Sequence, residues 1–175
     1  MVYSKLAMDL NALPRMVEAA LRGDGDRAAR LAAALEAVAQ AFGAVTATLH
    51  CSDPPGEVLH LVASRGLPEK ILPVARAIPF GKGMAGLCAA RREPVTVCNL
   101  QTDASGVARP AAKETGAGGA IVVPLLGPRG GKVLGTLGVG KPSEHVYSEE
   151  ELGVLKACAG AFAAWLDLHP GFPGE

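Results

Sequence analysis

The segment Ile78-Pro-Phe-Gly-Lys-Gly-Met-Ala-Gly86 decides the fold of this chain. Its three glycines match the G-x-G-x-x-G spacing of a dinucleotide-binding loop, which requires a buried strand just before the first glycine and a helix that crosses back to a parallel strand. Pro79 cannot donate to a strand ladder, and Pro94 leaves room for only about two helical turns after the glycines. The segment therefore predicts a tight strand-to-helix turn and not a nicotinamide or flavin dinucleotide site.

Alternating apolar residues predict one β-hairpin before this segment and another after it. Within the first hairpin, Leu59, Leu61 and Ala63 are expected to share one face of the sheet. A short strand between the two hairpins completes the pattern, which is typical of an α+β fold with one antiparallel sheet. The predicted strands cover residues 45–50, 58–63, 94–98, 120–126 and 133–139.

Helices are predicted near both ends of the chain. Pro14 suits the first turn of one helix, and Asp24 or Asp26 can cap the next. The final helix begins with a capping box, in which Ser148 is followed three residues later by Glu151. The second helix carries an apolar stripe of Leu31, Leu35, Val38 and Phe42. The final helix has two apolar faces, one with Leu152, Leu155, Ala159, Phe162 and Leu166, and one with Val154, Cys158, Ala161 and Trp165.

The composition excludes several classes of protein. Lys plus Arg and Asp plus Glu number 17 each, without a basic block, so no nucleic-acid partner is expected. No apolar run is long enough to span a membrane, and the N-terminus lacks the pattern of a signal peptide. The four cysteines have no C-x-x-C spacing, which argues against a zinc site and suits reduced thiols in a cytoplasmic protein.

The glycine-rich segment, the strand Ala120-Ile-Val-Val-Pro-Leu-Leu126, the strand Val133-Leu-Gly-Thr-Leu-Gly-Val139 and the helix start Tyr147-Ser-Glu-Glu-Glu-Leu152 together resemble a GAF domain. The resemblance implies a GAF- or PAS-like sheet of about five to six strands. The N- and C-terminal helices would cover one face, and short helices and loops would form a lid over the other. The expected organisation is a helical extension at residues 1–25, the GAF-like domain at 26–168 and a tail at 169–175.

In a GAF-type fold, a ligand pocket would lie between the sheet and a lid formed by residues 67–118. The glycines at the start of the lid can let the backbone approach a ligand, or can serve only the turn itself. Asn and Asp are also ordinary turn formers. The candidate ligand-binding residues are Phe80, Met84, Leu87, Cys88, Asn99, Asp103, Lys113 and Thr115.

One branch of the GAF family reduces free methionine-R-sulfoxide with cysteines. That branch carries a G-V-C-G pattern in the glycine-rich turn, where this sequence has Ala85, and an A-C-D segment, where it has Ala111-Ala-Lys113. The acidic residue that precedes the apolar strand is replaced by Gly119-Ala120. A displaced pair, Cys88 and Cys98, is the remaining route to thiol catalysis, although a free cysteine more often behaves as a small buried apolar residue.

The sequence does not match the motifs by which other GAF domains bind their ligands. The four histidines form no i, i+4 pair, and His145 is expected in a solvent-facing loop, so neither a metal nor another cofactor is expected. The cyclic-nucleotide signature and the bilin-binding Cys-His dipeptide are absent. We therefore expect a cytoplasmic sensory domain that binds an unknown small molecule or a partner and signals through its terminal helices. The same helices are expected to form the interface of a homodimer. A thiol-dependent reductase and a structural module that binds nothing are the alternatives.

Overall fold

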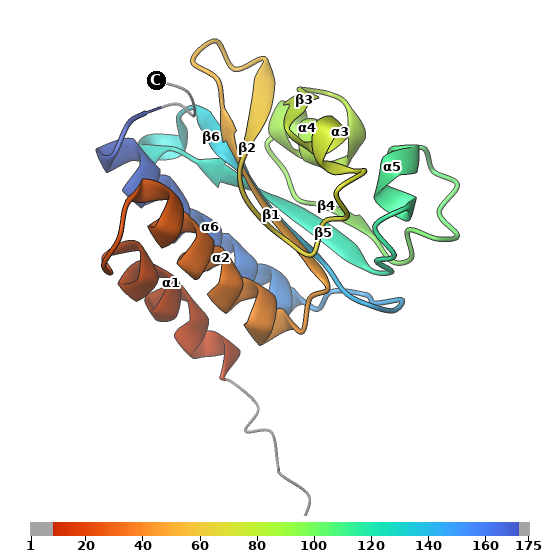
Figure 1. Ribbon diagram of the computed structural model, residues 1–175, viewed down its shortest axis with the longest axis horizontal. Helices are drawn as coiled ribbons and strands as arrows, with labels where there is room; N and C mark the ends of the chain where they lie inside the picture. The colour runs from red at the N-terminus through yellow and green to blue at the C-terminus, as the bar shows by residue number, and fades with distance from the viewer. Residues whose placement is uncertain (1–8, 172–175) are drawn as a thin grey trace, which may run out of the picture.

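The computed structural model describes residues 9–171 and shows one six-stranded antiparallel sheet with helices on both faces (Figure 1). The strand order in space is β3-β2-β1-β6-β5-β4, and both predicted hairpins are present. The expected α+β fold is confirmed. The strands are β1 (Thr46–Ser52), β2 (Val58–Arg65), β3 (Ala77–Pro79), β4 (Val95–Val97), β5 (Ala120–Leu126) and β6 (Val133–Gly140). The helices are α1 (Leu13–Leu21), α2 (Arg27–Phe42), α3 (Leu72–Ala75), α4 (Gly83–Arg91), α5 (Pro110–Lys113) and α6 (Glu149–Leu168), with short 3-10 turns at Leu10–Ala12 and Pro128–Gly130.

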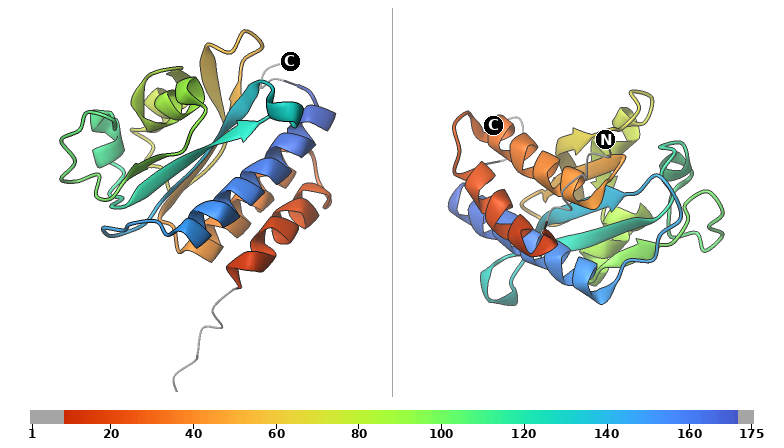
Figure 2. Two further views of the ribbon diagram at one scale, coloured as in Figure 1. Left: turned by 180° about the vertical axis from the view of Figure 1, so that it is seen from behind. Right: turned by 90° about the horizontal axis from the view of Figure 1, so that it is seen from below.

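Helices α1, α2 and α6 form a layer on one face of the sheet (Figures 1 and 2). The Asp26 carboxylate caps α2 by accepting a hydrogen bond from Ala29 N–H (2.9 Å), and Gly43 ends the helix in the left-handed conformation. Ser148 and Glu151 form the predicted capping box of α6. The main core lies between this layer and the sheet, with its largest buried side chains from Phe162, Leu31, Leu35, Leu49, Ile121 and Leu155.

Helix α1 belongs to this layer and packs against both α2 and α6. Its side chains Leu13, Val17 and Leu21 are at most 1% exposed, so the described part of the predicted N-terminal extension shares the core of the domain. Residues 1–8 of that extension and residues 172–175 of the predicted tail lie outside the described residues.

A β-bulge in β2 changes one prediction. The register pairs Leu49 with Ala63 but His50 with Leu61, so Val62 is an extra residue between two ladder positions. The face reverses at the bulge: Ala63 packs against the main core, whereas Leu61 lies on the same side as His50. The prediction that Leu59, Leu61 and Ala63 share one face is therefore wrong for Ala63. The bulge lets β2 contribute apolar side chains to both faces of the sheet.

The opposite face carries the short helices α3, α4 and α5, which form the lid (Figure 1). The glycine-rich segment makes the turn from the edge strand β3 into α4. Gly81 and Gly83 have φ angles of 84° and 63°, where a side chain is disfavoured. Gly86 is inside α4, and a Cβ there would lie 2.4 Å from the carbonyl oxygen of Pro79. Gly86 thus allows α4 to pack closely against the backbone of Pro79 in the same chain.

Among residues 9–171, no helix is both long and apolar enough to cross a lipid bilayer.

Candidate ligand-binding site

A cavity of about 150 Å³ lies between the sheet and the lid, and we call it the lid pocket. Its floor comes from the sheet, with Thr48 and His50 on β1 and Val122 on β5. The pocket has mainly apolar walls. The lid contributes these walls through Ile71, Val74, Ile78, Met84, Ala85 and Ala111.

His50 is the buried polar group of this floor, with 2% of its surface exposed. Its Nε2 lies 2.8 Å from the carbonyl oxygen of Ala75 in α3, and because a carbonyl only accepts, Nε2 carries the proton. Burial lowers the pKa of His50, outweighing the opposite effect of this backbone hydrogen bond, so the ring is neutral. Nδ1 is then an acceptor, and it has no hydrogen-bond partner. A buried acceptor without a partner destabilises a protein by about 1–3 kcal/mol.

Two cations lie at the exposed rim of the lid pocket. Lys82 precedes α4, and Arg109 precedes α5. The aliphatic part of Arg109 crosses the glycine turn, because a Cβ at Gly83 would lie 2.9 Å from its Cδ. Neither cation forms an ion pair with any of residues 9–171. No Asp or Glu lines the described pocket, so its rim is positively charged and its interior is neutral.

Of the eight residues predicted to bind a ligand, Met84 lines the lid pocket. Phe80 lines a different depression of about 240 Å³, beside Arg92 and Lys132. Leu87 and Cys88 pack into a small apolar cluster between α4 and the strands β4 and β5. Leu87 and Cys88 lie three and four positions after Met84, about one helical turn farther along α4, and neither lines the lid pocket.

The other four predicted residues belong to the loop around α5. Asn99 accepts a hydrogen bond from Gln101 N–H (3.0 Å), and the Asp103 carboxylate accepts one from the Ser105 hydroxyl (2.8 Å). Lys113 Nζ donates to the Asp103 carbonyl (3.1 Å) and Thr115 Oγ1 to the Ala112 carbonyl (2.6 Å). These polar groups hold the loop in shape and so place α5 over the pocket; none of the four lines the lid pocket.

The cysteines have different environments. Cys88 is fully buried, and burial raises the pKa of its thiol to about 12. Cys98 is exposed after β4. Ala85, which stands where the reductases carry a cysteine, lines the lid pocket with a methyl group. The wall of the pocket therefore has no thiol at this position, and the nearby Cys88 thiol is held in its unreactive protonated form.

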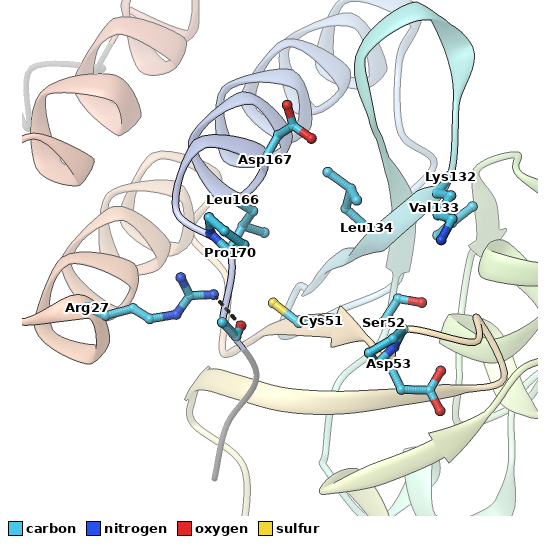
Figure 3. Close-up of a pocket in the computed structure, with 12 residues that line it drawn as sticks. Arg27, Cys51, Ser52, Asp53, Lys132, Val133, Leu134, Leu166, Asp167 and Pro170 are labelled. Carbon is cyan, nitrogen blue, oxygen red and sulfur yellow. Dashed lines mark hydrogen bonds between the residues drawn. The ribbon is translucent and has the colours of Figure 1, made fainter. Parts of the chain in front are cut away.

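A second cavity, of about 370 Å³, lies where the start of α2 meets the end of α6, and we call it the tail pocket (Figure 3). Arg27 at the start of α2 donates to the carbonyl oxygens of His169 and Gly171, the latter at 3.0 Å. Its guanidinium carbon lies 5.5 Å from the centroid of the Trp165 ring, which stacks on His169. The Cys51 thiol faces the same cavity, and burial raises its pKa to about 11 although Arg27 opposes the shift. Arg27 therefore ties the start of α2 to the end of α6.

Metal binding finds no support in the described part of the chain, where no group of three His, Cys, Asp or Glu side chains is arranged to hold an ion. His145 contacts both carboxylate oxygens of Glu151, at 2.9 and 3.0 Å, and its ring meets Tyr147 edge to face. It thus supports the start of α6.

Three of the residues that give the lid pocket its polarity were not among the predicted site residues: His50, Lys82 and Arg109. For His50 the sequence holds a signal, since it occupies the polar side of the alternating pattern in β1, the side that faces the lid. Arg109 gives no comparable signal, because its position depends on how the long loop between β4 and β5 folds.

Solved GAF-domain structures resemble this chain over most of its length. The GAF domain of a phosphoenolpyruvate-protein phosphotransferase from Coxiella burnetii has a TM-score of 0.78 and 22% identity, covering 94% of this chain and 96% of that one. The corresponding domain from Acinetobacter has a TM-score of 0.74 and 19% identity, covering 91% and 93%. Free methionine-R-sulfoxide reductase from Neisseria meningitidis, in complex with its substrate, has a TM-score of 0.75 and 20% identity, covering 95% and 93%.

At these identities the structural matches show a shared fold and leave the ligand open. No curated protein matches the chain in sequence. A sequence model of the GAF domain matches residues 26–167, which is most of the chain. Together with the six-stranded sheet and its lid, this match shows that the chain belongs to the GAF domain family.

Proposed function

We propose that this chain is a regulatory GAF domain that binds a small molecule in the lid pocket and signals through its terminal helices. The observation that carries the proposal is the buried, neutral His50, whose Nδ1 has no partner beside an apolar cavity. An apolar pocket with few polar groups is the usual form of a small-molecule site. A ligand that satisfies this acceptor removes an unfavourable feature of the fold.

Strand β1 gives the ligand a route to the helices. Thr48 and His50 face the lid pocket, while Ala47 and Leu49, which alternate with them, face the main core. Helix α3 is joined to this strand by the hydrogen bond from His50 to Ala75. A ligand that favours one position of α3 shifts the population of lid arrangements, by no more than the difference between its affinities for them.

A thermal-shift screen with a panel of metabolites tests the proposal. A ligand of the folded chain raises its melting temperature by mass action. Ala111→Phe places a ring in the lid pocket and should abolish the shift, whereas Glu114→Phe, at the exposed residue that follows the same short helix, should preserve it. A shift that survives Ala111→Phe would place the ligand elsewhere. A panel without any effective compound would favour a structural module that binds nothing.

The second candidate function is a thiol-dependent reductase of free methionine-R-sulfoxide, which the structural likeness to such enzymes favours. The buried Cys88 thiol, with its pKa of about 12, opposes it. An assay with free methionine sulfoxide and a thiol reductant decides between the two. Turnover that is lost in Cys88→Ala or Cys98→Ala would establish the reductase and overturn the sensory function.

The proposed signalling unit is a homodimer in the cytoplasm. The stripe of Leu31, Leu35, Val38 and Phe42 is at most 3% exposed within one chain, so the dimer would use the outer surface of α1 and α6. Leu168 on that surface is 76% exposed. The free state of all four cysteines supports a reducing compartment. Light scattering gives the mass: a monomer at every concentration would refute the dimer.

A further inference from the structure

We propose that the lid pocket takes a small organic acid with an apolar body and one neutral hydrogen-bond donor. Lys82 and Arg109 bind the carboxylate at the rim, the lid and sheet enclose the apolar body, and His50 Nδ1 accepts the hydrogen bond from the donor. A 2-hydroxy acid has all three features. The inference rests on the proposed ligand-sensing function and specifies its ligand.

The charge of the ligand follows from the rim. Lys82 and Arg109 both line the pocket, both are exposed, and neither has an ionic partner among the described residues. The aliphatic part of Arg109 lies across Gly83, where a Cβ would be 2.9 Å from the Arg109 Cδ. Two cations at the rim of one pocket match a carboxylate, since charged hydrogen bonds of this kind are about twice as strong as neutral ones.

The donor on the ligand follows from His50. The hydrogen bond to Ala75 uses the only N–H of the neutral ring, so Nδ1 can accept but cannot donate. Nδ1 is buried and His50 lines the lid pocket, so a donor on a ligand in this pocket would give Nδ1 the partner that it lacks. Because Nε2 of the same ring is bonded to Ala75, recognition of the donor is linked to α3, which is part of the lid.

The same lining argues against an amino acid as the ligand. An ammonium group in place of the hydroxyl would have no carboxylate to pair with, because no Asp or Glu lines the described pocket. It would also add positive charge close to Lys82 and Arg109. A buried charge without a partner is strongly disfavoured. The neutral donor is thus a hydroxyl or an amide N–H.

The volume limits the size of the ligand. The pocket measures about 150 Å³, below the roughly 300–1,000 Å³ of sites for drug-sized molecules. The walls are aliphatic side chains such as Ile71, Val74 and Val122, and the described lining residues include no Phe, Tyr or Trp. A short branched aliphatic chain suits these walls better than a planar ring, because close packing rewards matching shape.

Calorimetric titration with four matched compounds tests the inference on the unaltered chain. The compounds are 2-hydroxy-4-methylpentanoate, 4-methylpentanoate without the hydroxyl, 3-methylbutan-1-ol without the carboxylate, and leucine with an ammonium in place of the hydroxyl. We expect the hydroxy acid to bind most tightly. Loss of the hydroxyl should weaken binding by about three- to tenfold, and loss of the carboxylate by about tenfold or more. Leucine should bind more weakly than 4-methylpentanoate.

Variants assign these effects to residues. Arg109→Gln should weaken the hydroxy acid by about fivefold or more, whereas Arg91→Gln, on an exposed arginine at the other end of α4, should change nothing. His50→Phe should make the hydroxy acid and 4-methylpentanoate bind equally. If His50→Phe does not fold, the comparison of the two compounds on the unaltered chain still decides whether a donor is recognised.

Two failures are distinguishable. If a neutral or cationic metabolite stabilises the chain, and Ala111→Phe abolishes this effect while the organic acids do not bind, the sensory function stands and the ligand class is wrong. If the alcohol or leucine binds as tightly as the hydroxy acid, the assigned roles of the rim and of His50 are wrong. If no compound of either set binds, both the inference and the proposed function fail.

Discussion

The substitution Gly86→Ala in the glycine-rich segment has two opposing effects on the stability of the chain. Gly86 lies inside α4, where alanine is favoured over glycine by about 1 kcal/mol. A Cβ at this position would lie 2.4 Å from the Pro79 carbonyl oxygen and 3.2 Å from the Gly81 nitrogen. Both neighbours are backbone atoms, so the overlap is relieved only when the turn opens.

The turn is held by a hydrogen bond from Gly81 N–H to the Gly86 carbonyl, at 2.7 Å. Opening the turn weakens this bond, which contributes about 0.5–1.5 kcal/mol, and overpacking a well-packed site costs about 1–3 kcal/mol. These losses exceed the gain in helix propensity. We expect Gly86→Ala to destabilise the chain by about 1–3 kcal/mol.

Helix α6 offers matched controls for this substitution. Gly153 and Gly160 are helical and exposed, and apart from the adjacent residues and the backbone of α6 itself no atom lies within 4 Å of a Cβ built at either position. Alanine at these two positions should stabilise the chain by about 0.5–1 kcal/mol, because helix propensity acts there alone. The controls therefore measure the favourable term that Gly86→Ala must overcome.

Urea unfolding followed by circular dichroism gives the free energy of unfolding for the three variants. The reasoning predicts a lower value for Gly86→Ala and higher values for Gly153→Ala and Gly160→Ala. If Gly86→Ala stabilises the chain as much as the controls do, the close approach to Pro79 does not explain this glycine. A role in ligand contact would then have to be considered for it.

Three further predictions concern the helical layer. Phe162→Ala should cost about 3–5 kcal/mol of stability in urea unfolding, because the ring is fully buried, whereas Leu168→Ala, at a site 76% exposed, should change it by about 0.5 kcal/mol or less. Burial alone would raise the pKa of Glu151, but the hydrogen bonds from the Ser148 N–H and from His145 outweigh it and lower the pKa. The Glu151 carboxylate therefore stabilises the fold fully above its ordinary pKa. This stabilisation decreases as the pH falls through the lowered pKa. Glu151→Gln should therefore flatten the acid dependence of stability between about pH 5 and 3, and an unchanged slope would contradict this. Arg27→Ala should detach the segment after α6 and shift the fluorescence of Trp165, the only tryptophan, to longer wavelength. It should also lower the free energy of unfolding in urea by about 1–2 kcal/mol. Unchanged emission would show that Arg27 does not hold this segment.

Local sequence patterns predicted most of the fold because the structures that they indicate are formed by residues close together in the chain. Asp26 caps α2 and Ser148 caps α6 through bonds to residues three positions away, so each cap depends on a few neighbouring residues only. The strands between the helices were predicted from a period of two, and five predicted strands correspond to β1, β2, β4, β5 and β6. The edge strand β3 is too short, at three residues, to show a period.

The bulge at Val62 shows where a periodic pattern fails. Residues 58–63 alternate regularly, and the register shift opposite Leu49 and His50 arises from pairing with β1, which lies outside the segment. A bulge therefore cannot be predicted from the alternation of β2 alone, and one extra residue reverses every side chain beyond it.

The candidate site was the harder prediction, because its residues meet through tertiary contacts. Met84 was predicted to line the pocket from its place after the glycine turn, and it does so. The rim depends on Arg109, which the loop between β4 and β5 brings against Gly83, far away in sequence. That loop is held by bonds such as the one from Lys113 to the Asp103 carbonyl, and composition does not reveal them.

His50 links the lid to a strand that also borders the main core, so the proposed sensory function depends on β1. The residue contacts α3 through Nε2 and lines the lid pocket, while its neighbours Leu49 and Cys51 are buried in the core beneath α2 and α6. Because the core is close-packed, a displacement of β1 by a bound ligand must be accommodated by these helices. In the proposed sensor, a change at His50 would reach the helical layer through adjacent residues of one strand, without a path through the loops of the lid.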